Sequence, residues 1–108
     1  MALVYPFTPI ILNSLTATGV TQSARVNASA LTFQVTASGI GTNVKFRLEG
    51  SLDNVDFFNL NETEEDTTLS ANGTTGYALS ACPVEFVRLR VVSINGGSPT
   101  IATIVGAS

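Results

Sequence analysis

The sequence predicts an all-β protein, folded as a single antiparallel β-sandwich of the jelly-roll or immunoglobulin-like kind with about seven to nine strands. Three observations lead to this fold class. Several short segments alternate apolar and polar residues at the two-residue period of a strand. No stretch of ten or more residues shows the 3.6-residue apolar period of a helix, and Val, Thr, Ile and Phe are frequent. A length of 108 residues suits one such domain.

The clearest strand is predicted over residues 84–94, which we interpret as the central strand. Val87, Leu89 and Val91 would point into the core, and Arg88 and Arg90 would point outward. The strand is expected to begin just after Pro83, which lacks a backbone N–H, and to end at Asn95-Gly96-Gly97, which tolerate positive φ.

The remaining elements follow from the same reasoning. A polar segment rich in Asp and Asn separates the strands at 43–51 and 57–60, which predicts a hairpin. The segment 38–43 is expected to turn the chain, because it holds Gly39 and Gly41. The other expected strands are 8–13, a weak one within 14–21, 30–37, a short edge strand or polar connection within 67–76, 76–81 and 100–105.

Residues 1–9 are predicted to form an extended arm, and residues 10–108 the sandwich domain. Pro6 and Pro9 disfavour a helix in the arm. Its apolar side chains need cover, either from the arm's own sandwich or from a neighbouring subunit. These side chains belong to Leu3, Val4, Tyr5 and Phe7.

Composition excludes several classes of function. Charged residues make up 12% of the chain and the net charge is -3, so we expect no nucleic-acid partner, whose binding would need a basic stripe. No apolar run is long enough for a membrane span, and we expect no membrane partner. The sequence has no histidine, which removes the Ser-His-Asp and Cys-His arrangements, and Cys82 is the single cysteine. We therefore expect a protein that is not an enzyme and has no catalytic residues.

Carboxylates gather at two places, Asp53 with Asp56 and the segment 61–66. Turn oxygens of this kind either bind calcium or are simply solvated, and neither segment has the spacing of an EF-hand loop. We therefore predict no metal and no cofactor. The segment 61–66 is instead a candidate contact with a partner through Glu62, Glu64 and Glu65.

Four of the five basic residues fall on outward strand positions. Arg88 and Arg90 on the central strand either form cross-strand ion pairs with Glu49 and Glu85 or dock on an acidic partner. Together with the apolar arm and the acidic segment, they complete the candidate partner-binding residues: Leu3, Val4, Tyr5, Phe7, Glu62, Glu64, Glu65, Arg88 and Arg90.

Two segments carry a resemblance to a known family. Residues 44–60, VKFRLEGSLDNVDFFNL, resemble a hairpin of small β-sandwich structural proteins of tailed bacteriophages, and 83–93, PVEFVRLRVVS, resembles a strand of the same proteins. Both also echo discoidin-like carbohydrate-binding modules, but Phe57-Phe58 stands where those modules commonly have Trp. The size resembles that of capsid decoration or cement proteins.

The resemblance implies a non-enzymatic virion structural protein, a capsid decoration or cement protein on the capsid exterior. Its partner would be the major capsid protein, whose shell it would stabilise, and it would act as a homo-oligomer, a trimer or dimer. Two alternatives stay open: a phage tail, neck or baseplate component, and a discoidin-like glycan-binding module.

Overall fold

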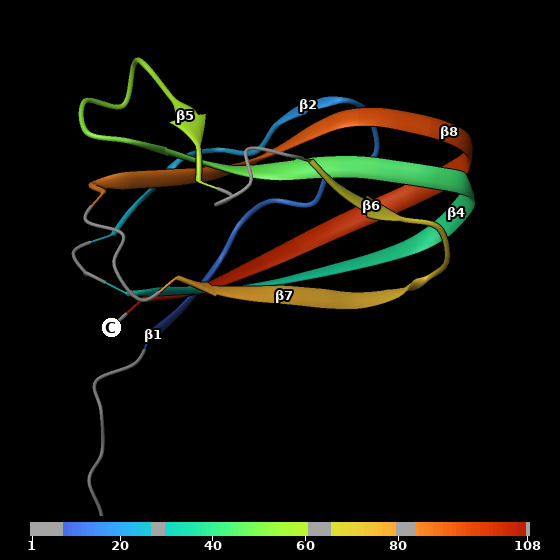
Figure 1. The fold of residues 1–108 in the computed structure, drawn as a ribbon, viewed down its shortest axis with the longest axis horizontal. Helices are drawn as coiled ribbons and strands as arrows, with labels where there is room; N and C mark the ends of the chain where they lie inside the picture. Colours follow the sequence, from blue (N-terminus) through green and yellow to red (C-terminus); the bar gives the residue numbers. More distant parts are fainter. Residues whose placement is uncertain (1–7, 27–29, 61–65, 80–83, 108) are drawn as a thin grey trace, which may run out of the picture.

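The computed structural model describes residues 8–26, 30–60, 66–79 and 84–107. Within these ranges all regular elements are strands and all strand pairs are antiparallel, which confirms the predicted fold class (Figure 1). The strands are β1 (Thr8–Ile11), β2 (Gly19–Val20), β3 (Ala24–Arg25), β4 (Leu31–Ser51), β5 (Phe58–Asn59), β6 (Thr67–Leu69), β7 (Gly73–Leu79) and β8 (Phe86–Ala107). In the part of the chain described here, no helix is long and apolar enough to cross a membrane.

Two strands are far longer than the sequence predicts. β4 has 21 residues and β8 has 22, and they pair with each other from Leu31 opposite Ala107 to Ser51 opposite Phe86. The predicted turn at 38–43 and the predicted strand end at 95–97 are therefore wrong, because the strand continues through both segments. The two strands bend together there, with register shifts between Ser38 and Asn43.

Glycines explain why the strands bend instead of ending. Gly39 and Gly97 have φ values of 71° and 70°, a region that residues with a Cβ rarely enter. They also face each other, since a Cβ on Gly97 would lie 2.5 Å from the carbonyl oxygen of Gly39. Glycine on both strands thus lets the two backbones curve in close contact.

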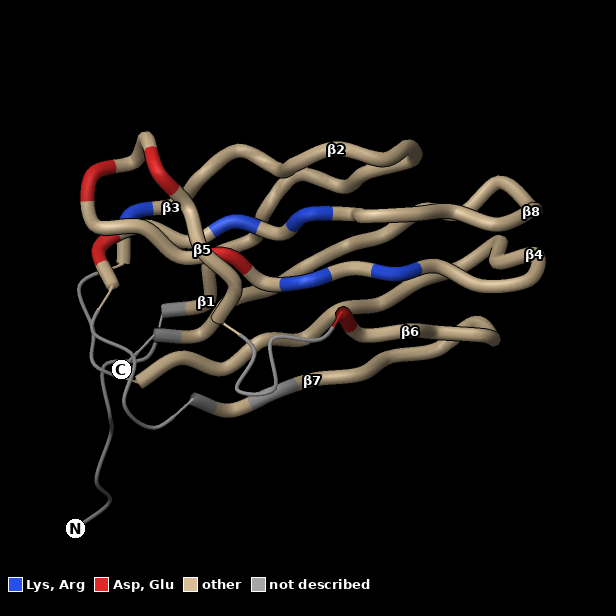
Figure 2. The backbone as a smooth tube through the Cα atoms, turned by 45° about the horizontal axis from the view of Figure 1, so that its top comes forward, with Lys and Arg blue, Asp and Glu red and all other residues tan. Residues whose placement is uncertain are grey.

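The bend folds this one sheet into two layers, which are seen one above the other in Figure 1. We call the lower one the uncharged layer; it consists of β7, residues 31–38 of β4, residues 100–107 of β8, and β1. We call the upper one the charged layer; it consists of β5 and β6, residues 43–51 of β4, residues 86–95 of β8, and β2 with β3. The strands of the uncharged layer hold no Asp, Glu, Lys or Arg, whereas all five basic residues belong to the charged layer (Figure 2).

The core lies between the layers and includes the three residues of the central strand that were predicted to point inward. The central strand is confirmed, because β8 lies beside β4 in the middle of both layers and its three predicted core residues are at most 1% exposed. Alternate residues along β4 and at the end of β8 are buried in the same way. They are Leu31, Phe33, Val35, Val44, Phe46, Leu48, Ile101, Thr103 and Val105.

The smaller elements agree in part with the sequence. The predicted hairpin is confirmed by the pairing of β4 with β5, and the predicted first strand is present as β1. Thr8 and Pro9, which the sequence assigns to the arm, pair in β1 with Ala107 and Gly106. The rest of the predicted arm, Cys82 and Pro83 lie outside the described residues.

Candidate partner-binding surface

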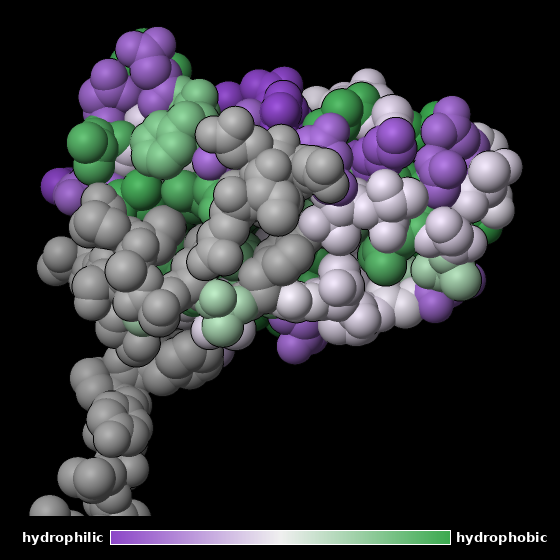
Figure 3. Space-filling model, viewed as in Figure 1, coloured by the Kyte–Doolittle hydropathy of each residue, from purple (hydrophilic) through white to green (hydrophobic). Residues whose placement is uncertain are grey.

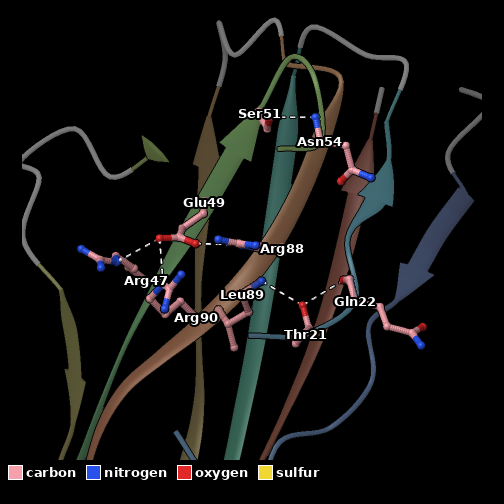
Figure 4. Close-up of polar contacts among 9 residues, drawn as sticks. All are labelled: Thr21, Gln22, Arg47, Glu49, Ser51, Asn54, Arg88, Leu89 and Arg90. Carbon is pink, nitrogen blue, oxygen red and sulfur yellow. Dashed lines mark hydrogen bonds and ion pairs between the residues drawn. The ribbon is translucent and has the colours of Figure 1, made fainter. Parts of the chain in front are cut away.

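Glu49 lies at the centre of the outer face of the charged layer and is enclosed by three arginines (Figure 4). The Nε of Arg88 donates to Oε1 at 2.8 Å, and the Nε of Arg90 donates to Oε2 at 3.0 Å. The Nε of Arg47 lies 3.3 Å from Oε2. The side chain of Glu49 is only 7% exposed, so its charge is compensated mainly by these guanidinium groups.

Arg47 also lies 3.9 Å from a carboxylate oxygen of Asp66. Among the residues that the structure describes, the three arginines of the cluster outnumber these two carboxylates by one. The arginine side chains are 20 to 35% exposed, so each is only partly covered by the protein. A guanidinium group whose position is fixed in this way can bind a carboxylate of a partner.

Arg88 links this cluster to the hairpin between β4 and β5. Its guanidinium carbon lies 3.7 Å from the centre of the Phe57 ring, in the geometry of a cation–π contact. Arg88 is therefore held by a carboxylate and a ring together. The face of Phe57 that Arg88 covers is therefore not open to a partner.

A compact set of hydrogen bonds holds the turn of this hairpin, residues 52–57. The buried Ser51 hydroxyl oxygen accepts from the backbone N–H of Asn54 at 2.9 Å and donates to Oδ1 of Asp53 at 2.9 Å. The same Oδ1 accepts from the backbone N–H groups of Val55 and Asp56, each at 2.9 Å. Asn54 takes a φ of 63°, which Asn tolerates better than most residues.

These contacts favour the charged form of the Asp53 carboxyl. The N–H groups of Asp56 and Val55 and the hydroxyl of Ser51 hold its pKa below the ordinary value of 3.8. Asp53 therefore acts as a structural acceptor within the turn.

The hairpin carries three exposed apolar side chains. Leu52 is 69% exposed, Val55 75% and Phe58 50%. We call these three residues the apolar tip. Figure 3 shows apolar groups beside strongly hydrophilic ones at this end of the molecule. Apolar side chains on a rigid, hydrogen-bonded turn are typical of a protein contact site.

The structure brings together only some of the predicted partner-binding residues. Arg88 and Arg90 both form ion pairs with Glu49, as one of the two interpretations of the sequence predicted. Glu85 instead pairs with Arg25, at 2.7 Å. The docking of the two arginines on a partner stays a prediction. Seven predicted contacts lie outside the described residues: Leu3, Val4, Tyr5, Phe7, Glu62, Glu64 and Glu65.

The apolar tip was not predicted from the sequence. Residues 50–56 were interpreted as a polar turn, although Leu52 and Val55 interrupt the polar residues. Two apolar residues in a turn of otherwise polar residues are the signal that could have indicated a contact site.

The described residues hold no group of three or more His, Cys, Asp or Glu side chains able to bind a metal ion. Asp53 and Asp56 share one turn, but an oxygen of Asp53 is already used by the turn's own N–H groups.

No family model and no curated protein matches this sequence. Among solved structures, the crystal structure of the SPBc2 prophage-derived protein YomS is similar, with a TM-score of 0.62 and 16% sequence identity. The match covers 99% of this chain and 100% of that chain, so the two proteins share their fold along the whole length. A structure of Bacillus endospore appendages, described as a novel family of disulfide-linked pili, has a TM-score of 0.40 at 8% identity, covering 94% of this chain and 88% of that chain.

Proposed function

We propose that this chain is a non-enzymatic structural protein of a virion, and that it decorates the capsid exterior by binding the major capsid protein and stabilising the shell. The observation that carries the proposal is the fold shared along the whole chain with a prophage-derived protein. The resemblance of residues 44–60 and 83–93 to phage structural proteins supports the same role.

The contact would use the hairpin end of the charged layer. The apolar tip would enter an apolar depression of the partner, and the excess positive charge of the arginine cluster would face an acidic group beside it. Apolar anchors flanked by arginine forks are a common composition of protein interfaces. As an oligomer, a dimer or trimer, the protein would present several such ends to the shell, which raises its avidity.

The test is sedimentation with empty phage capsids. We expect the protein to pellet with capsids in a fixed ratio, and the double variant L52S/V55S to lose at least about tenfold in affinity, because two apolar anchors are removed. Ile11→Ser is the matched control, since Ile11 is 78% exposed on the uncharged layer. A protein that stays in the supernatant but binds isolated tails would overturn capsid decoration in favour of the tail, neck or baseplate alternative.

The predicted arm gives a second test. Because Thr8 and Pro9 pair in β1, the deletion should end at residue 7 and leave the sheet intact. We expect the shortened protein to keep its melting temperature but to bind capsids more weakly. Capsid binding equal to that of the full chain would rule out the arm as a contact.

A further inference from the structure

β7 is an edge strand whose outer side is open in the described structure. It pairs with β4 alone, through seven consecutive residue pairs from Gly73 opposite Ala37 to Leu79 opposite Leu31. Figures 1 and 2 both place it at the margin of the uncharged layer. In an antiparallel pair, about half of the backbone N–H and C=O groups of an edge strand point away from its neighbour. β7 therefore offers a row of hydrogen-bonding groups to another strand.

The other edge strands of the described residues carry features that block such pairing. β1 contains Pro9 and has four residues. β2, β3 and β5 have two residues each, and β6 has three. Short length, proline and charge are the usual ways in which proteins keep sheet edges from pairing. β7 has seven residues, GTTGYAL, with no proline and no charge, and its register is unbroken.

Small residues leave the backbone of β7 accessible. Gly76 lies in the middle of the strand and has no side chain; a Cβ there would lie 2.5 Å from the carbonyl oxygen of Phe33 on β4, the strand with which β7 is already paired. The exposed positions on either side are Thr74 and Ala78, both small. A glycine flanked by small residues permits the close approach of another backbone.

Charge indicates which partner can approach this edge. Each copy of the chain carries a net charge of -3, so two copies repel each other overall. The four strands of the uncharged layer contain no charged residue, and β7 forms one of its two edges. A second copy can therefore approach β7 against β7 with little repulsion, and antiparallel strands of identical sequence are complementary about a two-fold axis.

We propose that β7 is a homodimer contact, in which two copies pair their β7 strands antiparallel and join their uncharged layers into one continuous sheet. This is strand addition to an open sheet edge with a second copy as the added strand. The inference goes beyond the proposed capsid attachment and does not depend on it, because the pairing forms between copies in solution.

The test is the mass in solution, measured by light scattering across a range of concentrations. We expect a species of twice the 11.2 kDa chain mass. Ala78→Lys should weaken the dimer at least about tenfold, because it places a charge at the paired edge of both copies. Gln34→Lys is the matched control, since Gln34 is exposed on the same layer but lies on β4, one strand in from the edge. It should leave the dimer intact.

Amide hydrogen exchange supplies a direct readout of the backbone. Protection of the outward amides of residues 73–79 should fall when the protein is diluted below the dimer dissociation constant, while residues 31–37 keep theirs. Circular dichroism would verify that Ala78→Lys remains folded. The proposal would be overturned by a monomer at all concentrations, by a trimer, or by an Ala78→Lys variant that still dimerises. It would also be overturned if amide exchange in residues 73–79 did not change on dilution.

Discussion

The burial of Glu49 shows how single side chains set the chemistry of the charged layer. Its position alternates outward, yet its side chain is 7% exposed because Arg47, Arg88 and Arg90 lie over it. Burying a carboxylate is costly unless other groups donate hydrogen bonds to it and balance its charge. For Glu49, the Nε atoms of Arg88 and Arg90 do both. Glu49 therefore fixes the positions of the arginine side chains, and the arginines in turn balance its negative charge.

Replacing Glu49 by Gln should lower the free energy of unfolding by about 1–3 kcal/mol, because three arginines would then repel one another without their central anion. The cost stays below that of a fully buried pair because the arginines are partly solvated. Urea unfolding measures it. Glu85→Gln is the control, since its pair with Arg25 is exposed and should contribute less than about 1 kcal/mol. Equal losses in the two variants would contradict a special role for Glu49.

The lowered pKa of Asp53 predicts how the stability of the protein changes at acid pH. Its pKa is lowered in the folded state, so its ionised form stabilises the fold above the unfolded pKa of 3.8, and this stabilisation is lost as the pH falls through the lower folded pKa. Asp53→Asn should therefore lose less stability than the unsubstituted protein between pH 6 and pH 3. Urea midpoints at both pH values measure the difference.

Asp56→Asn is the matched control for Asp53→Asn. Asp56 supports the turn through its backbone N–H, which the substitution keeps. A variant at position 53 with the full acid sensitivity of the unsubstituted protein would show that Asp53 does not contribute to it.

At the scale of elements, the two bent strands β4 and β8 define the molecule. Each crosses both layers, and the bend depends on glycines that meet across the pair. The strands that flank them are shorter, and each belongs to one layer only. The bend is thus the element that turns one sheet into a sandwich.

Gly97→Ala should destabilise the protein by roughly 2–5 kcal/mol, because Ala would have to adopt a φ of 70° and its Cβ would collide with the backbone at Gly39. Gly73→Ala is the control, as its Cβ would meet nothing within 4 Å. It should range from neutral to about 1 kcal/mol more stable. Thermal unfolding of both variants tests the bend, and a Gly97→Ala protein as stable as the control would refute this account of it.

At the scale of the whole molecule, the same two strands pass through both layers, so we expect the layers to unfold together. We expect one cooperative transition, in which far-UV circular dichroism and the hydrodynamic radius change at the same urea concentration. Amides of the two halves of β4 should share one free energy of opening in native-state hydrogen exchange. Two transitions, or a layer that exchanges alone, would contradict this coupling.

The sequence by itself determined the fold class, the inward face of each long strand and the hairpin. These properties depend on local period and turn residues, so they can be predicted for segments such as 31–37 and 86–91 without a partner. It also indicated that Arg88 and Arg90 would pair or bind on the outward face. The candidate site was therefore predicted in part, through its arginines but without the apolar tip.

Only the tertiary structure decided that 31–51 is one bent strand, that Glu49 is buried and that β7 has an open edge. Each depends on residues far apart in sequence: Gly39 faces Gly97, and Glu49 binds arginines 39 and 41 positions away. Glycine after a strand normally indicates a turn, and only contact with a second glycine-bearing strand makes a shared bend possible. Alternation shows which way a side chain points, but its neighbours in the folded protein decide whether water reaches it.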